Sequence, residues 1–263
     1  MAGYYVSTIN DIGSGISNWR IWTMLALNDI KQRYRRSMLG QFWLTLSMAI
    51  LVLGMGLVYS ILFKTETKTY IPYVATTFVL WAFISTNILE STNAFIDNER
   101  IILHISVANS TFIFRTIYRN VLVLLHNVLI IPVTFVVFGL SVSWSILWLI
   151  PGFILVSLNC FWIGYCIAII CARYRDVPQI IASVMQILFF VTPIMFKPTQ
   201  LGEHSYVIYA NPLASFLEVL RDPILGEPPS VLALGICAIL LVIGSLAMLA
   251  FAGRYSQRVV YWL

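Results

Sequence analysis

Long apolar stretches separated by short polar ones run along most of this chain. They predict six membrane spans, at residues 42–63, 71–90, 117–139, 146–171, 179–196 and 231–252. A helix needs about 20 apolar residues to cross a bilayer. Barrel strands are excluded, because they are short and alternate apolar with polar positions. The pattern predicts an all-α integral membrane protein with a transmembrane domain at residues 42–252. The composition agrees, with 60% hydrophobic and 10% charged residues.

The third and fourth spans lie within one uncharged run. Residues 120–172 contain no Asp, Glu, Lys or Arg, and this run is too long for a single span. Turn-forming residues divide it, at Gly139, Ser141, Ser143 and Ser145. We therefore expect the chain to reverse near these positions.

Lys and Arg are distributed unevenly between the two sides of the membrane. Six spans place both termini, including the tail 253–263, on one side. That side carries twelve of the 16 basic residues: Arg20, Lys31, Arg33, Arg35, Arg36, Arg100, Arg115, Arg119, Arg173, Arg175, Arg254 and Arg258. The other side carries Lys64, Lys68, Lys197 and Arg221. The positive-inside rule then makes both termini cytoplasmic. The net charge of +5 reflects this orientation, and nucleic-acid binding is excluded because no solvated basic domain is present.

The N-terminal arm, residues 1–41, contains a predicted interfacial helix at 16–36. Apolar residues precede a basic run there, which is typical of a helix in the cytoplasmic headgroup layer. The residues expected at this interface are Trp19, Trp22, Lys31, Arg33, Arg35 and Arg36. The alternative is an unstructured arm whose basic run only fixes the topology. The first 15 residues lack the apolar core of a cleavable signal peptide.

The cytoplasmic loop 91–116 is too long for a simple turn. It mixes aliphatic residues with four polar or charged candidates, Asp97, Glu99, Arg100 and His104. This mixture favours a short amphipathic helix parallel to the membrane, and an exposed apolar cluster there indicates a partner surface. A solvated loop is the alternative.

The external segment 197–230 is too apolar to lie in water and too rich in proline to span the membrane. We expect short re-entrant or interfacial helices there. The breaks are expected near Asn211-Pro212 and Asp222-Pro223, because a residue before proline is biased away from the helical conformation.

Candidate catalytic groups are sparse. The three histidines, His104, His126 and His204, lie in different segments, and no span contains a carboxylate pair. His126 is expected to be a neutral group hydrogen-bonded between helices. The four cysteines lack the paired spacing of a metal site. We therefore expect no catalytic residue, metal or cofactor in this chain. No Lys follows a Gly, so the phosphate-binding Gly-Lys-Ser/Thr element is missing and ATP-driven work would need a separate ATPase.

Two spans carry polar or aromatic faces. In the first, one face contains Thr45, Gly56 and Tyr59 and suits close packing or a lumen, while an aliphatic stripe suits lipid. In the fifth, Gln179, Ser183, Gln186 and Phe190 recur at helical spacing on one face. Glutamines within a membrane are costly unless they face water, substrate or a partner helix. Pore lining and interhelical hydrogen bonding both remain open.

Four motifs along the chain resemble type-2 ABC exporter permeases for polysaccharides such as O-antigen, capsule and teichoic acid. They are DIKQRYRRSMLGQFW at 29–43, ARYRD at 172–176, FVTPIMF at 190–196 and NPL at 211–213. The resemblance covers most of the chain.

This resemblance implies a homodimer that recruits two copies of a separate ATPase, which would bind ATP and Mg. The segment 91–116 would couple to the ATPase, 16–36 would lie near the substrate entrance, and 197–230 would form external gate helices. The first and fifth spans would line the conduit. The implied cargo is an undecaprenyl-type lipid-linked polysaccharide, with O-antigen as first choice, exported across the bacterial inner membrane.

Two other functions remain open. One is a type-2 ABC exporter of drugs or small lipids. The other is an intramembrane acyltransferase or glycosyltransferase, which the missing acid/base cluster disfavours.

Overall fold

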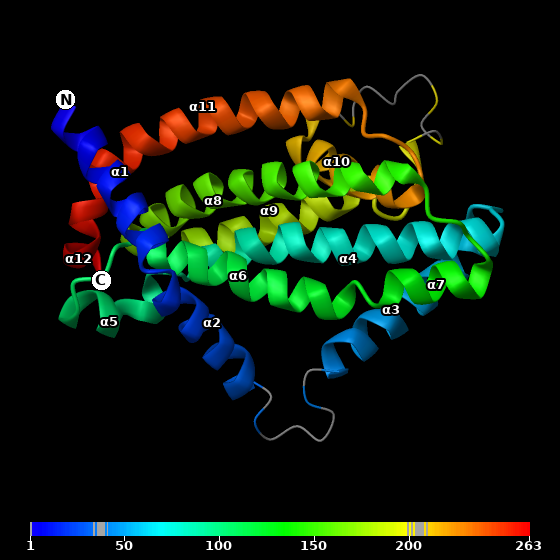
Figure 1. The fold of residues 1–263 in the computed structure, drawn as a ribbon, viewed down its shortest axis with the longest axis horizontal. Helices are drawn as coiled ribbons and strands as arrows, with labels where there is room; N and C mark the ends of the chain where they lie inside the picture. Colours follow the sequence, from blue (N-terminus) through cyan, green and yellow to red (C-terminus); the bar gives the residue numbers. More distant parts are fainter. Residues whose placement is uncertain are drawn as a thin grey trace.

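The computed structural model describes residues 2–33, 35, 40, 42–198, 200, 202, 208 and 210–263, with side chains from Val6 onward. The described residues form helices and turns, and no strand occurs among them. In chain order the elements are α1 (Ala2–Ser17), α2 (Trp19–Arg33), α3 (Phe42–Leu62), α4 (Thr67–Ser91), η1 (Ile96–Asn98), α5 (Glu99–His104), α6 (Ser110–Asn127), α7 (Ile130–Phe138), η2 (Trp144–Trp148), α8 (Leu149–Arg173), α9 (Val177–Val191), α10 (Pro212–Leu225), α11 (Val231–Tyr255), η4 (Ser256–Arg258) and α12 (Val259–Trp262). Both termini lie at one end of the molecule (Figure 1). The prediction of an all-α protein is confirmed.

Five of the predicted spans are matched by long helical segments, one of which consists of α6 and α7 together. Within the described residues, the segments long and apolar enough to cross a membrane are Phe42–Leu62, Thr67–Ser91, Ser110–Phe138, Trp144–Arg173 and Val231–Trp262. The prediction for 179–196 is wrong at its end, because α9 stops at Val191. Its 15 residues extend about 22 Å, which is less than the ~30 Å hydrocarbon core. Thr192 is extended because it precedes Pro193. The six-span count therefore stays a prediction.

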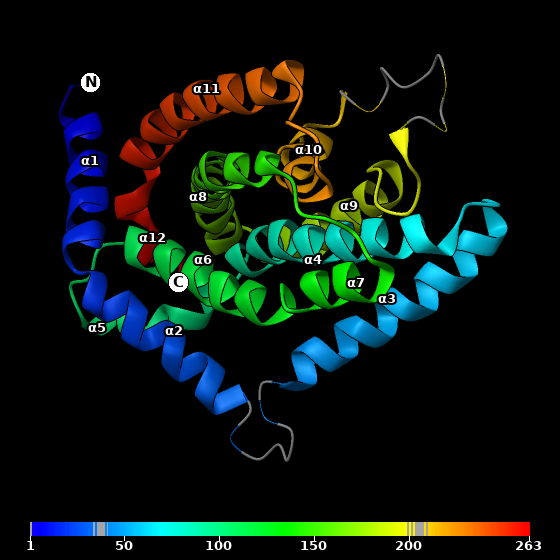
Figure 2. The ribbon, with the colours of Figure 1, turned by 45° about the vertical axis from the view of Figure 1, so that its right-hand side comes forward.

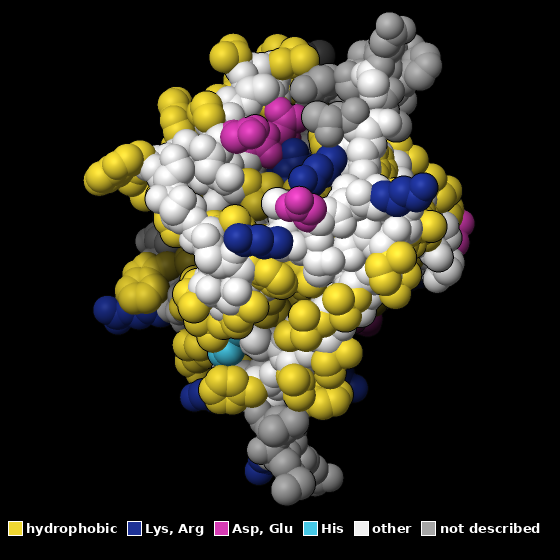
Figure 3. Space-filling model, turned by 90° about the vertical axis from the view of Figure 1, so that its right-hand side faces the viewer, with side chains coloured by type: hydrophobic (Ala, Val, Ile, Leu, Met, Phe, Trp, Pro, Cys, Tyr) yellow, Lys and Arg dark blue, Asp and Glu magenta, His cyan; other side chains and the backbone are white. Residues whose placement is uncertain are grey.

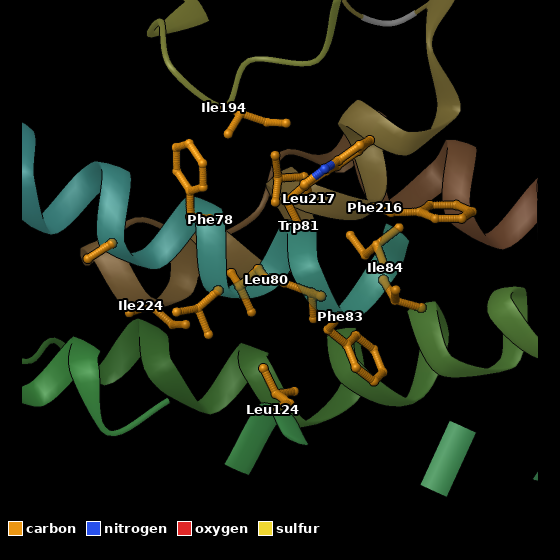
Figure 4. Close-up of a cluster of buried hydrophobic side chains, with 14 of the residues drawn as sticks. Phe78, Leu80, Trp81, Phe83, Ile84, Leu124, Ile194, Phe216, Leu217 and Ile224 are labelled. Carbon is orange, nitrogen blue, oxygen red and sulfur yellow. The ribbon is translucent and has the colours of Figure 1, made fainter. Parts of the chain in front are cut away.

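Helix α4 forms the centre of the fold. It runs through the middle of the molecule, with α3, α6 and α7 on one side and α9 and α10 on the other (Figures 1 and 2). Figure 4 shows its side chains Phe78, Leu80, Trp81, Phe83 and Ile84 in a cluster with Leu124, Ile194, Phe216, Leu217 and Ile224. This packing buries 89% of the apolar part of α4.

The uncharged run reverses where the serines predict it. The first part ends at Gly139, whose left-handed backbone (φ 67°) favours glycine. Ser143 then caps η2 by accepting a hydrogen bond from the Ser145 N–H. The predicted third span is broken into α6 and α7 around Val128 and Leu129. Among the described residues the His126 ring has no hydrogen bond to another helix, and its Nδ1 lies 2.7 Å from the Leu122 carbonyl oxygen of the same helix.

The N-terminal arm forms two helices where one was predicted for 16–36. The chain bends at Asn18, so residues 16 and 17 belong to α1, and α2 begins at Trp19. The Trp22 indole N–H donates to the Gly15 carbonyl across this bend, at 3.1 Å. Arg36 and Tyr34 lie outside the described residues.

The described residues of the external segment include one well-buried helix, α10. It begins at the predicted break, where the Asn211 side chain accepts a hydrogen bond from the Leu213 N–H and Pro212 takes the first helical position. The second predicted break is wrong, because Pro223 lies inside α10 and the helix continues to a left-handed Gly226 (φ 99°). A proline near a helix end interrupts few backbone bonds, and packing of the helix offsets that loss.

Candidate functional site

A network of five charged side chains joins α2 to α4 and α6 at the end of the molecule where the termini lie. The Asp29 carboxylate accepts from Arg115 Nε at 2.8 Å and Nη2 at 2.5 Å, and from Arg119 Nη1 at 2.9 Å. Arg119 Nη2 also donates to Glu90 at 2.9 Å. Arg33 Nη2 approaches the other Glu90 oxygen at 3.6 Å. Because Asp29, Arg115 and Arg119 are each less than a fifth exposed, these bonds hold α2 firmly against the bundle.

Sequence reasoning missed this network. It interpreted the charges of 16–36 as contacts with lipid headgroups, and counted Arg115 and Arg119 only for membrane orientation. A usable signal was present, because Asp29 and Glu90 are acidic residues at the ends of apolar segments, where an uncompensated carboxylate would be costly.

The predicted coupling segment contains a short helix, as expected, but it is shorter than 91–116. Residues 110–116 belong to α6, because Asp11 of α1 caps that helix. The Asp11 carboxylate accepts from the Asn109 N–H at 2.8 Å and from the Ser110 N–H at 2.9 Å. A carboxylate at a helix N-terminus satisfies free N–H groups and the helix dipole.

Three of the four coupling candidates face outward from η1 and α5. Asp97, Arg100 and His104 are exposed, and their spacing places them on one side of the turn. Glu99 is half-buried, and Ile102 is buried against the bundle. The segment therefore offers a charged surface on a fixed apolar anchor.

The coupling segment and the charge network share one side chain. Arg115, which binds Asp29, also donates through Nη1 to the Asn98 Oδ1 at the end of η1. Asn98 is itself held by a bond from its amide to the Ala94 carbonyl at 2.8 Å. A displacement of η1 would therefore act directly on α2 through Arg115.

The four conduit candidates on α9 share one exposed face. Gln179, Ser183, Gln186 and Phe190 are all exposed, and the Ser183 hydroxyl donates to the Gln179 carbonyl of the same helix at 3.1 Å. The neighbouring face packs on α4 through Phe189, whose ring lies 5.8 Å from that of Phe78. No hydrogen bond or ring contact joins the stripe to another helix within the described part of the chain.

Tyr59 is not brought to this stripe. It is half-buried on α3, and its ring lies 5.6 Å from that of Phe63. On the same face Gly56 packs tightly on Ile71 of α4, where an added Cβ would lie 2.9 Å from the Ile71 Cγ1. This face of α3 therefore serves packing on α4, which was one of the two uses predicted for it.

The entrance candidates have different environments. Trp19 is 54% exposed, and Lys31, Arg33 and Arg35 are exposed as well, which suits an interface. Trp22 instead packs on α6, with its ring 5.3 Å from Tyr118 and 5.9 Å from Phe114.

A second charged group, which sequence reasoning also missed, lies at the opposite end of the molecule. Arg221 of α10 is only 4% exposed and donates to Asp222 at 2.8 Å and to the Tyr73 hydroxyl at 3.2 Å. It also donates to the Pro193 carbonyl at 3.4 Å, which ties α10 to the end of α9. Burial raises the pKa of the Asp222 carboxyl, although the neighbouring Arg221 opposes this shift.

These charges surround a recess of about 560 Å³ that also contains Lys197 and Glu218. Figure 3 shows acidic and basic side chains gathered around a hollow on this end face.

Comparison with known proteins identifies the family. The sequence model described as "ABC-2 type transporter" matches residues 21–225, which is most of the chain. The chain belongs to the ABC-2 type transporter family. The predicted resemblance is thereby confirmed at the level of the family, and this ABC-2 chain is a membrane transport subunit, not an enzyme, that works with an ATPase on a separate chain.

Three curated relatives resemble this ABC-2 chain over most of its length. Two proteins from Klebsiella pneumoniae named "O-antigen export system permease protein RfbA" are 25% and 24% identical over 199 residues, 74% of this chain and 76% of each relative. A protein of the same name from Myxococcus xanthus is 22% identical over 200 residues, 73% of this chain and 75% of its own.

The family match covers both charge groups and the two predicted working surfaces. The bonds of Asp29 with Arg115, the α5 surface and the α9 stripe all lie within 21–225 of this ABC-2 chain, whereas Asp11 lies outside that range. The roles of the coupling, conduit and entrance residues stay predictions.

Proposed function

We propose that this chain is the transmembrane subunit of an ATP-driven exporter of a lipid-linked polysaccharide, with O-antigen as the cargo. Two copies form a homodimer and bind two copies of the separate ATPase, which holds ATP and Mg. Both termini lie in the cytoplasm, and the cargo crosses the bacterial inner membrane outward.

The observation that carries this proposal is the name shared by the three relatives, each aligned over about three quarters of its length. The free surfaces of the chain support it. The apolar part of α3 is only 17% buried, and α9 presents two glutamines, a serine and a phenylalanine away from the bundle. Neutral polar groups and an aromatic face suit sugar hydroxyls and ring faces without binding them tightly. A second copy facing α3 and α9 would enclose a passage of that chemistry.

The contacts at the cytoplasmic end suggest how ATP hydrolysis reaches this passage. In our proposal the ATPase pushes on the exposed surface of η1 and α5. The push passes through Asn98 and Arg115 to Asp29, and so to α2 beside the entrance. Arg119 and Glu90 pass the same displacement to the cytoplasmic end of α4. Hydrogen-bonded charge pairs transmit such a displacement well, because each bond is directional and costly to break while partly buried.

Reconstitution tests the proposal. The chain and its ATPase, purified together in lipid vesicles, should form a complex with two copies of each by mass measurement. ATP should move a lipid-linked O-antigen across the bilayer, scored by its accessibility to a glycan-binding protein on the far side. Transport of small amphiphilic drugs with no movement of the glycan would contradict the proposal, as would ATP hydrolysis by the permease alone.

A further inference from the structure

A narrow cleft lies between α3, α4 and α6, close to the end of α2. Its volume is about 290 Å³, near the lower limit of ligand pockets in proteins. It lies in the halves of α3 and α4 nearest the termini, since it is lined by the first turns of α3 and the last turns of α4. In the proposed orientation this is the cytoplasmic leaflet.

The chemistry of the cleft changes along its length. Arg33 and Glu90 line one end, at the level of the charge network. Beyond them the walls are largely apolar, with Leu44, Met48, Leu51, Val79, Phe83 and Leu124. A charged end followed by an apolar slot has the polarity of a membrane lipid.

The polar side chains in the walls are largely occupied by the protein itself. The hydroxyls of Ser47 and Thr86 donate to carbonyls of their own helices, at 2.9 and 2.6 Å. The Asn120 amide reaches Asn87 at 3.4 Å. Among these wall residues Asn127 differs, because its Oδ1 has no hydrogen-bond partner within the described residues.

Arg33 and Glu90 form the mouth of the cleft, and they leave room for a headgroup that carries both a positive and a negative charge. One Glu90 oxygen is bonded to Arg119, but the other is 3.6 Å from Arg33, which is too long for a hydrogen bond. A carboxylate oxygen that is ion-paired but accepts no hydrogen bond from Arg33 therefore lies beside a half-exposed guanidinium. A purely anionic headgroup would be attracted by Arg33 and repelled by Glu90. A headgroup with a phosphate and a primary ammonium would be attracted by both.

We propose that this cleft binds one phospholipid of the phosphoethanolamine type, with its phosphate on Arg33, its ammonium on Glu90, and one acyl chain between α3, α4 and α6. The binding depends only on this chain and the bilayer, and not on which cargo is exported.

Native mass spectrometry tests the proposal. The protein is released from bilayers that contain equal amounts of phosphatidylethanolamine, phosphatidylglycerol and phosphatidylcholine. We expect one phosphatidylethanolamine per chain to survive release, above the other two lipids. Equal retention of the three lipids, or of none, would overturn the proposal. Preference for phosphatidylglycerol, or for a polyprenyl diphosphate when that lipid is added to the mixture, would also overturn it.

Variants of the mouth sharpen the test. Glu90→Gln should lower the preference for phosphatidylethanolamine over phosphatidylglycerol about fivefold, the size expected for one charge contact at a membrane surface. Asp176→Asn removes an exposed carboxylate outside the cleft, and should leave that preference unchanged. An equal effect of the two substitutions would mean that surface charge alone selects the lipid.

Variants of the walls test the acyl chain. Ala82→Phe, at a half-buried position, should fill the slot and abolish retention. Ser47→Phe should do the same from the exposed rim, and replaces the first variant if Ala82→Phe does not fold. Asn127→Leu should keep retention or raise it. Loss of the lipid in Asn127→Leu would mean that a polar ligand binds the amide, and unchanged retention in both phenylalanine variants would place the lipid elsewhere.

Discussion

Helices α3 and α4 are neighbours, yet they are built in opposite ways. The apolar part of α3 is 17% buried, whereas that of α4 is 89% buried, although α3 is the more apolar of the two. The buried helix contains more hydroxyl and amide groups than α3. Its own carbonyls accept hydrogen bonds from Thr76 at 2.9 Å, Thr77 at 2.6 Å and Asn87 at 2.7 Å. In a bilayer, lipid is as apolar as leucine, so apolarity marks lipid-facing or partner-facing surfaces and small polar groups mark the interior.

The largest expected effect comes from removing a core side chain of α4. Phe83 is 2% exposed, and its ring lies 5.2 Å from that of Phe153. Phe83→Ala should destabilise the fold by about 3–5 kcal/mol, the usual result of leaving a cavity at a buried phenylalanine. Thermal unfolding in detergent measures this, with Phe42→Ala on the 71% exposed end of α3 as control. Equal losses in the two variants would break the contrast between α4 and α3.

A smaller effect is expected from the charge network that joins α2 to both α4 and α6. Asp29→Asn leaves Arg115 and Arg119 partly buried without their carboxylate, and should cost about 2 kcal/mol. Hydrogen exchange should rise mainly in α2 and η1. Lys31→Asn is the matched control on the same helix. Uniform exchange across the chain would mean that Asp29 does not position α2.

The coupling surface should affect assembly and leave the fold intact. Reversing the charge of Glu99 or Arg100 should weaken ATPase binding by about 1–2 kcal/mol, because contacts of exposed or half-buried charges are modest, and should abolish export. Co-purification of the ATPase and an export assay measure the two effects, with Arg20 reversal as control. Normal copurification and export in both variants would exclude this surface as the docking site.

The smallest effect on stability is expected at the α9 stripe. Gln186→Leu and Phe190→Ala should lower export while the dimer and ATPase binding persist. Ile187→Ala is the control, because it removes an exposed residue from the adjacent aliphatic side of α9. If the glutamines only join helices, the variants should lose roughly 0.6 kcal/mol per bond and transport normally.

Cysteine labelling gives an independent reading of the stripe. Single cysteines at 183, 186 and 190, with the four native cysteines removed, should react with small water-soluble thiol reagents during ATP-driven transport. Protection of all three positions, at rest and during transport, would exclude pore lining.

The positions of the helices followed from the sequence wherever one physical rule dominated. Apolar length located five spans, Gly139 located a chain reversal, and Asn211-Pro212 located the start of α10, because these are local effects. The predictions failed where contacts with residues far away in the sequence determine where a helix begins or ends. Asp11 starts α6 earlier than its own sequence suggests, and the packing of α10 carries a helix through Pro223.

In the candidate site, too, local patterns were predictable and long-range contacts were not. The α9 stripe was visible as a spacing, and the structure places its four residues on one face. The pairing of Asp29 with Arg115 spans 86 residues and could not be read from either local sequence. Hydrophobicity also does not predict which helix is central, since α4 is less apolar than its exposed neighbours.

The bond between Asp29 and Arg115 also sets an order of events during synthesis. Asp29 leaves the ribosome 86 residues before its partner, and both α3 and α4 are made in between. Until α6 emerges, α2 has neither of its arginine partners and can rest on the membrane surface through its tryptophans and lysine. Docking of α2 is therefore a late step, completed only after the first membrane helices are in place. A substitution at Asp29 should then trap nascent chains with α2 protease-sensitive, even when every transmembrane segment has been inserted.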